Sequence, residues 1–268
     1  MPTPLPSHRL VAHNAATASE NKIHDDAVAR RYGFSGGLVP GITVFGYLTH
    51  PVVETWGREW LERGTMSARF RRPIYDGEAV EVVGTFEGGT RAEVEARNPA
   101  GEVCALATAT LPAAAAPPPS LDDYPTASLP AERHDPSPEA LRPIDRLGTV
   151  EAGFHAGRVD ETLALVGDDL PIYRELAVAH PTWILFLANA LLASNVALGP
   201  WIHTASDVTN LGLLGDGERL SARGRVARLY EKAGHQLVDL DILMVADGTR
   251  PVMALRHTAI YCLRQPGG

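Results

Sequence analysis

Two long apolar segments dominate the hydropathy pattern of the chain. Between Ile42 and Trp56, apolar residues recur at positions 42, 44, 45, 48, 52 and 53, the spacing of a helix buried on one broad face. Pro51 falls inside this run and predicts a kink or a break, because proline lacks the N–H that a helix interior needs. The second segment, from Thr182 to Leu198, is apolar nearly all round, which predicts a deeply buried helix.

Each apolar segment is followed by stretches in which apolar and polar residues alternate and β-branched residues are frequent. Asp-Gly or Asn-Pro-Ala-Gly turns separate these stretches, a combination typical of antiparallel strands. The clearest examples read VEARNPAGEVCALATATL in the first half and LVDLDILMVADGTRPVMALRHTAIYCL in the second. A buried helix followed by an antiparallel sheet is therefore expected twice, and the expected fold class is a duplicated α+β fold.

The two helix-and-sheet segments share an order of landmarks. Pro40 precedes the first helix and Trp60 follows it at the same spacing that separates Pro181 and Trp201 in the second half. The tripeptide Asp-Gly-Glu recurs at 76–78 and 216–218. A repeated order of this kind indicates duplication, whereas a chance match of a common turn is the alternative.

Between the halves, residues 112–143 are rich in proline and lack apolar periodicity. Such a composition predicts a linker that is locally stiffened toward polyproline II. The expected organisation is a first unit at 1–111, this linker, and a second unit at 144–268.

Charge and composition narrow the functional classes. The 268 residues carry a formal net charge of −8, which argues against broad binding to nucleic acid or anionic membranes. Cys104 and Cys262 lie far apart, so neither a metal site nor a redox pair is expected. The chain starts without a secretion signal and its second apolar segment is interrupted by polar residues, so we expect a cytoplasmic protein. Walker A, GxGxxG, HExxH and GxSxG motifs are all absent.

The candidate chemistry lies in the loop before the first helix, SENKIHDDAVARRYGFSGGLVPG, which spans 19–41. It presents Asn21 and His24 beside the start of a buried helix. Histidine exchanges protons near neutral pH, and the free N–H groups at a helix N-terminus favour negative charge that develops on an oxygen. The loop therefore predicts acid/base chemistry on a carbonyl compound, with a solvent-exposed or capping histidine as the alternative for His24.

This loop resembles that of the MaoC-like hot-dog hydratases, which carry Asp-x-Asn-x-x-His and then a glycine-rich segment that ends in His-Gly-Met at the helix start. Two positions depart from that pattern: Ser19 stands where the family has its catalytic aspartate, and Pro40 stands where it has histidine. The positions that match are Asn21, His24, Phe34, Gly36 and Gly41.

The resemblance implies a double hot-dog fold and the addition of water to 2-enoyl thioesters, which gives (R)-3-hydroxyacyl thioesters. The substrate would be a thioester of CoA or of acyl carrier protein in fatty acid metabolism, with no permanently bound cofactor, and the protein would be a homodimer. His24 would be the general acid/base, Asn21 the group that orients it, and Gly41 the backbone donor to the thioester carbonyl. Ser19 would position the water.

Arg69, Arg71 and Arg72 form a cluster after the first helix. Arginine forms paired hydrogen bonds with phosphate, so these side chains are candidates to bind the phosphates of the thioester carrier. A solvated strand face is the alternative.

The second half offers no replacement for the site, because Ala164 and Gly167 fall where asparagine and histidine would be needed. His180, directly before the second helix, is interpreted as a capping or packing residue.

Two other classes remain open for the function. Hot-dog thioesterases also polarise a carbonyl at the helix start but need a carboxylate nearby, for which Glu54 is the candidate on the first helix. The departures at Ser19 and Pro40 leave a non-catalytic protein that binds acyl groups or other small molecules as the third possibility.

Overall fold

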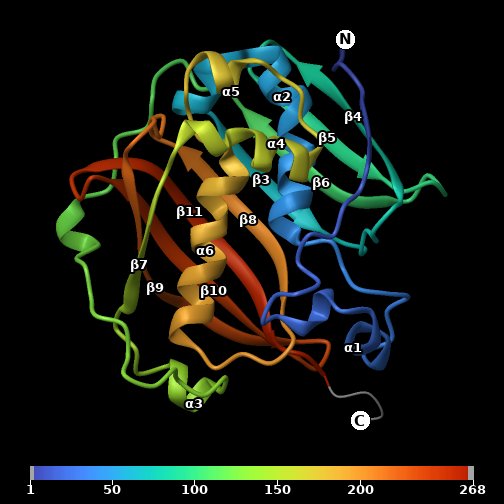
Figure 1. Cartoon of the computed structure of the whole chain (residues 1–268). Helices are drawn as coiled ribbons and strands as arrows, with labels where there is room; N and C mark the ends of the chain where they lie inside the picture. The colour runs from blue at the N-terminus through green and yellow to red at the C-terminus, as the bar shows by residue number, and fades with distance from the viewer. Residues whose placement is uncertain (1–2, 265–268) are drawn as a thin grey trace.

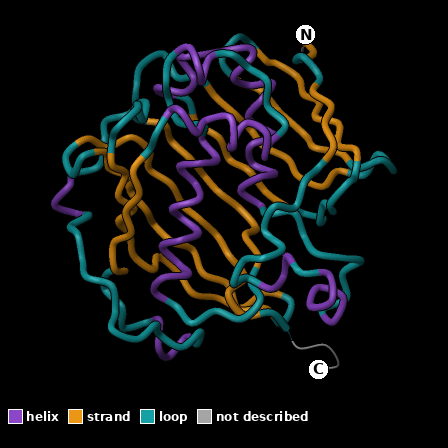
Figure 2. Tube along the Cα trace, viewed as in Figure 1, coloured by secondary structure: helices purple, strands orange, loops and turns teal. Residues whose placement is uncertain are grey.

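The computed structural model describes residues 3–264. One antiparallel sheet of eleven strands curves around two helices that lie side by side, α2 (Gly41–Arg63) and α6 (Pro181–Asn195) (Figures 1 and 2). The strands are β1 (Thr3–Pro4), β2 (His8–Val11), β3 (Thr65–Phe70), β4 (Ala79–Glu87), β5 (Arg91–Arg97), β6 (Val103–Thr110), β7 (Leu147–Gly153), β8 (Ile202–Asn210), β9 (Arg219–Lys232), β10 (His235–Ala246) and β11 (Arg250–Cys262). The shorter helices are η1 (Lys22–His24), α1 (Asp26–Arg31), η2 (Leu121–Asp123), α3 (Pro138–Leu141), η3 (Ala156–Arg158), α4 (Val159–Val166) and α5 (Ile172–Glu175).

The sheet is built from two copies of one strand order that meet at a seam between β3 and β8. Its central order is β4-β5-β6-β3-β8-β11-β10-β9, so each half contributes the strands that follow its own long helix in the same arrangement. At the seam Ser67 lies opposite Asp207. The protein therefore has the predicted double hot-dog fold, with both long helices packed against one continuous sheet.

The Asp-Gly-Glu tripeptides occupy equivalent turns in the two halves. The carboxylate of Asp76 accepts a hydrogen bond from the backbone N–H of Asn14 at 2.7 Å. Asp216 accepts the matching bond from Ala156 at 2.8 Å. The recurrence in the sequence thus marks a structural repeat, and the chance-match alternative is wrong.

The equal Pro-to-Trp spacing, in contrast, does not mark equivalent positions. The backbone N–H of Val39 donates to Ile74 O at 2.9 Å, and that of Ala179 donates to Leu214 O at 2.9 Å. These two bonds are equivalent, so equivalent residues of the two halves differ by 140 in number (179 minus 39). At that offset the residue equivalent to Pro40 is His180. In addition, Trp60 lies inside the longer helix α2, whereas Trp201 follows the end of α6.

The predicted break at Pro51 is wrong, because α2 continues through this residue to Arg63. The helix instead departs from helical dihedral angles at Gly57, where φ is 55° and ψ is −137°. Leu48 and Val52, on either side of the proline, are fully buried. We attribute the tolerance of Pro51 to this burial, because most helix stability in proteins comes from packing of the apolar face.

Residues 112–143 lack long elements, as expected, but they are packed against the second half rather than free. Tyr124 Oη donates to Asp241 Oδ1 at 2.9 Å, and the N–H of Ala127 donates to Thr149 Oγ1 at 3.0 Å. Arg133 reaches the first half and forms an ion pair with Glu20 at 3.0 Å. The segment therefore ties the two halves together outside the sheet.

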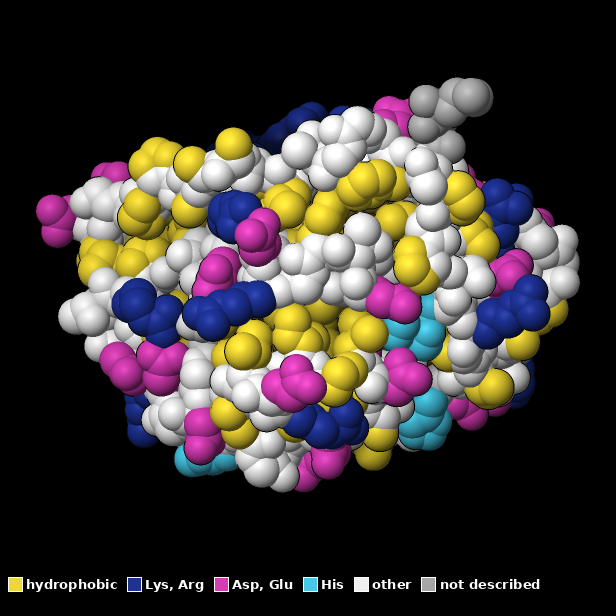
Figure 3. Space-filling model, turned by 90° about the horizontal axis from the view of Figure 1, so that it is seen from above, with side chains coloured by type: hydrophobic (Ala, Val, Ile, Leu, Met, Phe, Trp, Pro, Cys, Tyr) yellow, Lys and Arg dark blue, Asp and Glu magenta, His cyan; other side chains and the backbone are white. Residues whose placement is uncertain are grey.

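Acidic and basic side chains are interspersed with apolar ones on the face seen in Figure 3. Within residues 3–264, no helix combines the length and the apolar character that a membrane span requires.

Candidate active site

The loop between β2 and α2 holds Asn21 and His24 through its own short helix, η1. Asn21 is the N-cap of this helix, and its Oδ1 accepts a hydrogen bond from the N–H of Ile23 at 3.3 Å. Ile23 is buried and anchors the loop. Asparagine favours this position because its short side chain satisfies a free N–H of the first turn.

The contacts of His24 define the roles of its two ring nitrogens. Nδ1 lies 2.7 Å from Leu38 O, and because a carbonyl only accepts, Nδ1 carries the hydrogen. Nε2 is then the unprotonated nitrogen, 3.2 Å from Asn21 Nδ2. Burial lowers the pKa of His24 below its ordinary value, although the bond to Leu38 opposes that shift. His24 is therefore a neutral imidazole at neutral pH, with its basic nitrogen on the side of Asn21.

The start of α2 is open. Its N-cap, Pro40, forms no side-chain capping bond, and the first N–H groups of a helix have no acceptor within the helix. A Cβ on Gly41 would lie 2.8 Å from His203 Nδ1 and 3.0 Å from His203 O, so this residue has to be glycine. Backbone N–H groups at such an end can polarise a carbonyl oxygen.

Two adjoining cavities, each of about 210 Å³, meet at the candidate residues. The first is enclosed by the loop, the start of α2 and the start of β8, and Gly41, Ile202 and His203 line it. The second follows α6 and is lined largely by apolar groups, including Ile42, Phe186 and Leu198. Residues common to both are Asn21, His24, Pro40, Asn189 and Trp201. An elongated substrate could thus pass His24 with one end in each cavity.

Ser19 lines the second cavity together with His24, and its Oγ donates to Asn21 O at 3.1 Å. The neighbouring acidic residues have other partners. Asp25 accepts from the N–H of Val28 at 3.0 Å. Asp26 accepts from Gly37 at 2.8 Å, and Glu20 is paired with Arg133. Neither Asp25 nor Asp26 lines either of these two cavities. Glu20 lines the second, with its carboxylate directed to Arg133.

The three arginines divide between two places. Arg71 and Arg72 line the first cavity. Arg72 pairs with Glu102 at 3.2 Å, whereas no ion pair of Arg71 is found among residues 3–264. Arg69 is directed to the seam instead, where its Nη1 lies 2.7 Å from Asp207 Oδ1. Only Arg71 and Arg72 are therefore placed to meet a ligand in the cavity.

The equivalent helix start in the second half is closed. His180 is the N-cap of α6, and its Nδ1 accepts a hydrogen bond from the N–H of Thr182 at 3.0 Å. Pro181, at the first helical position, has no N–H. The predicted capping role of His180 is confirmed, and no N–H donor of this first turn is left for a ligand.

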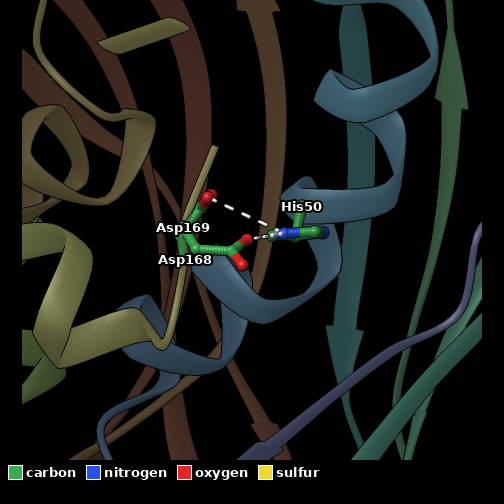
Figure 4. A group of neighbouring side chains, drawn as sticks. All are labelled: His50, Asp168 and Asp169. Atoms are coloured by element: carbon green, nitrogen blue, oxygen red, sulfur yellow. Dashed lines mark hydrogen bonds and ion pairs between the residues drawn. The ribbon is translucent and has the colours of Figure 1, made fainter. Parts of the chain in front are cut away.

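Ionisable side chains lie beside this closed helix start. Figure 4 shows three of them, His50 on α2 and Asp168 and Asp169 on the loop after α4, facing one another. His180 Nε2 lies 3.4 Å from Asp168 Oδ2, and both side chains are fully buried. His50 Nε2 lies 3.1 Å from Asp169 Oδ1 and 3.8 Å from Asp168 Oδ1. Three ligand atoms of His50, Asp168 and Asp169 come within 4.8 Å of one another, a spacing that would suit a divalent cation. Asp169 is exposed, and exposed acidic groups of this kind are common without a bound ion.

Sequence reasoning missed Asn189, Trp201 and His203, all of which line the first cavity. They belong to the second half and line the same cavity as His24 because α6 and β8 lie beside the first half. The polar Asn189 in the middle of a largely apolar helix and the histidine in the strand beginning at Ile202 were the visible signals.

No family model and no curated protein matches the sequence. Solved structures match the fold over nearly the whole chain. A putative MaoC domain protein dehydratase from Chloroflexus aurantiacus has a TM-score of 0.63 at 12% identity, with 98% of this chain and 95% of that chain covered. A protein from Mycobacterium tuberculosis described as a double hot-dog fold has a TM-score of 0.64 at 14% identity, with 97% and 96% covered.

A putative oleoyl thioesterase from Lactobacillus plantarum is also similar, with a TM-score of 0.54 at 11% identity and 97% of each chain covered. The protein is thus a double hot-dog protein. Its fold is that of MaoC-like dehydratases and, more distantly, of a thioesterase, so the activity has to be argued from the site.

Proposed function

We propose that the protein is a MaoC-like hydratase/dehydratase that interconverts 2-enoyl and 3-hydroxyacyl thioesters. One observation carries the proposal: the unprotonated nitrogen of a neutral histidine and an uncapped helix start line the same cavity. The first can take a proton from water, and the second can stabilise the oxygen that becomes negative.

In the hydration direction, the thioester carbonyl would accept hydrogen bonds from the N–H groups of Gly41 and Ile42. His24 Nε2 would exchange its hydrogen bond from Asn21 Nδ2 for one from water and take one proton from that water. At the same time the water oxygen would bond to C3 and the C2–C3 double bond would shift toward the carbonyl. The resulting enolate would then take the proton from His24 at C2. Asn21 keeps the imidazole in place, and Ser19 contributes a hydroxyl at the edge of the site.

The carrier of the acyl group would lie toward Arg71 and Arg72. Their guanidinium groups suit the phosphates of CoA or of an acyl carrier protein. The apolar second cavity would hold the acyl chain. A cytoplasmic location, a place in fatty acid metabolism and a homodimer are parts of the same proposal.

The thioesterase alternative has less support from the site. Glu54 lines neither cavity and lies 3.9 Å from His50 Nδ1, beside the closed second site. A hydrolase would have to use Glu20, which is paired with Arg133. A non-catalytic binding protein would need the cavities but not the basic nitrogen of His24.

The test is the loss of enoyl absorbance when crotonyl-CoA is hydrated, run beside release of free CoA from an acyl-CoA. The parent chain should hydrate crotonyl-CoA, and His24→Ala should lower the rate by ~10²–10⁴-fold, the usual effect of removing a positioned acid/base group. Hydrolysis without hydration would favour the thioesterase. Tight binding of acyl-CoA with neither reaction would favour the binding protein.

A further inference from the structure

His203 is a buried histidine at the wall of the first cavity. It lies on β8, is 5% exposed and is stacked on His257, with ring centroids 4.1 Å apart. Phe70 packs against it in a T-shaped arrangement, with ring centroids 4.8 Å apart. These contacts fix the plane of the His203 ring.

The hydrogen bonds of His203 determine its tautomer. Nε2 lies 3.0 Å from Ala205 O and 2.9 Å from Ser206 Oγ. Because the carbonyl can only accept, Nε2 carries the hydrogen. Ser206 in turn lies 3.2 Å from His257 Nδ1, to which its hydroxyl can donate. Nδ1 of His203 is then an acceptor.

That acceptor has no partner among the described residues. It lies 2.8 Å from where a Cβ of Gly41 would be, at the open start of α2. Buried acceptors are nearly always hydrogen-bonded, so an unpaired one on a residue that lines the cavity indicates a ligand that donates a hydrogen bond. A bound water or a hydroxyl group of a substrate has the required chemistry.

We propose that His203 Nδ1 is the second polar group of the reaction site, and that it accepts a hydrogen bond from the water whose other proton passes to His24. The inference rests on the proposed hydratase function. Water has two hydrogens, and two acceptors would orient its oxygen toward C3. One proton moves to His24 Nε2 and then to C2, and the other stays on the new 3-hydroxyl group. In dehydration, His203 would hold the hydroxyl that leaves.

The two histidines are not equivalent bases. Burial, followed by the nearby His257, lowers the pKa of His203 well below its ordinary value. The helix start beside it acts in the same direction, because its partial positive charge disfavours an imidazolium. Burial also lowers the pKa of His24, but the bond to Leu38 O opposes the shift there. The proton therefore goes to His24, and His203 acts as a hydrogen-bond acceptor.

This arrangement gives a reason why the site can lack the carboxylate that Ser19 replaces. The second acceptor comes from the other half of the chain, across the start of α2. No charged group is then buried at the reaction site.

Two amide substitutions of His203 distinguish the roles of its two ring nitrogens. In His203→Asn the amide lies near the former Nδ1, so an acceptor stays at the cavity wall. In His203→Gln the amide lies near the former Nε2, so the bonds to Ala205 and Ser206 are kept and the acceptor at the cavity wall is lost. His13→Gln, at an exposed histidine, is the control and should match the parent.

For crotonyl-CoA hydration we expect His203→Gln to lose on the order of 10²-fold in kcat, the effect of misplacing a reacting group. His203→Asn should stay within about tenfold of the parent. The reverse order, equal loss in both variants, or parent-like activity of His203→Gln would each overturn the proposal.

A second measurement uses the parent protein and tests the proposal even if the His203 variants do not fold. In the parent with ¹⁵N-labelled histidine and ring signals assigned to single residues, (R)-3-hydroxybutyryl-CoA should shift the unprotonated Nδ1 signal of His203, and the shift should persist in His24→Ala. Absence of such a shift overturns the proposal. A parent that does not hydrate crotonyl-CoA overturns the proposed function and this role together. An active, His24-dependent parent that tolerates His203→Gln overturns only the role of His203.

Discussion

The side chain of Asn21 is hydrogen-bonded to the backbone of Trp201 on both sides of its amide. Asn21 Nδ2 donates to Trp201 O at 2.9 Å, and Asn21 Oδ1 accepts from the N–H of Trp201 at 3.1 Å. The same Nδ2 lies 3.2 Å from His24 Nε2. One residue thus fixes the position of the candidate base relative to the strand that carries His203, although the two come from different halves of the chain.

The position of Ser19 leads to the first prediction. Ser19→Asp should raise the rate of crotonyl-CoA hydration by about tenfold, because a carboxylate beside the cavity can share the water with His24 and favour its imidazolium form. Absorbance of the enoyl thioester measures the rate. The gain should disappear in Ser19→Asp/His24→Ala. A folded Ser19→Asp protein without any gain would argue that the pocket has been rebuilt for another reaction or for binding.

Gly41→Ala tests how closely the start of α2 packs against His203. The added Cβ would lie 2.8 Å from His203 Nδ1, so we expect a loss of about 1–3 kcal/mol in the free energy of unfolding, typical of overpacking. Urea unfolding measures it. Gly157→Ala is the matched control, since a Cβ there meets nothing within 4 Å. Equal stability of the two variants would show that the contact is not tight.

The arginines at the first cavity should act on substrate binding. Replacing Arg71 and Arg72 together with alanine should raise KM for crotonyl-CoA by about tenfold, which corresponds to about 1.4 kcal/mol, and leave kcat nearly unchanged. Steady-state kinetics at two salt concentrations would check this, because ion pairs with phosphates weaken with salt. Arg58→Ala, on the far part of α2, is the control. A KM independent of both residues would remove them from the binding site.

Buried histidines predict how stability depends on pH. Burial lowers the pKa of His257 from its ordinary 6.5 to about 3. Between these values the unfolded chain binds a proton that the folded chain does not, so stability falls as the pH drops below about 6.5. This residue contributes up to about 1.4 kcal/mol per pH unit.

Urea unfolding between pH 7 and pH 4 measures that slope. In His257→Gln the titrating group is absent, and the loss of stability on acidification should be smaller. An unchanged slope would mean that His257 is already protonated in the folded protein or is not buried in solution.

The sequence was most informative where the relevant residues are close along the chain. Asn21, His24 and Gly41 occur within one loop and the helix start that follows it, so their pattern alone brought them together. The Asp-Gly-Glu turns at 76–78 and 216–218 revealed the duplication because turns need particular residues at fixed places.

Contacts between the two halves could not be predicted from local sequence patterns. Asn189 and His203 come to line the cavity beside His24 through the pairing of β3 with β8 and the packing of α6, and no local pattern encodes that arrangement. The break predicted at Pro51 does not occur, because burial of the residues around it outweighs the low helix propensity of proline. Arg69 was grouped with its neighbours by sequence, although its partner, Asp207, lies across the seam.

The closed start of α6 has a consequence for how the chain can change over time. Because His180 caps α6 and Pro181 has no N–H, the start of α6 offers no donor to a reacting carbonyl. Substitutions on α6 at the second cavity can then alter which acyl groups fit while the proton-transferring loop in the first half stays intact. A change of substrate range through α6 would then leave Asn21, His24 and the open start of α2 in place.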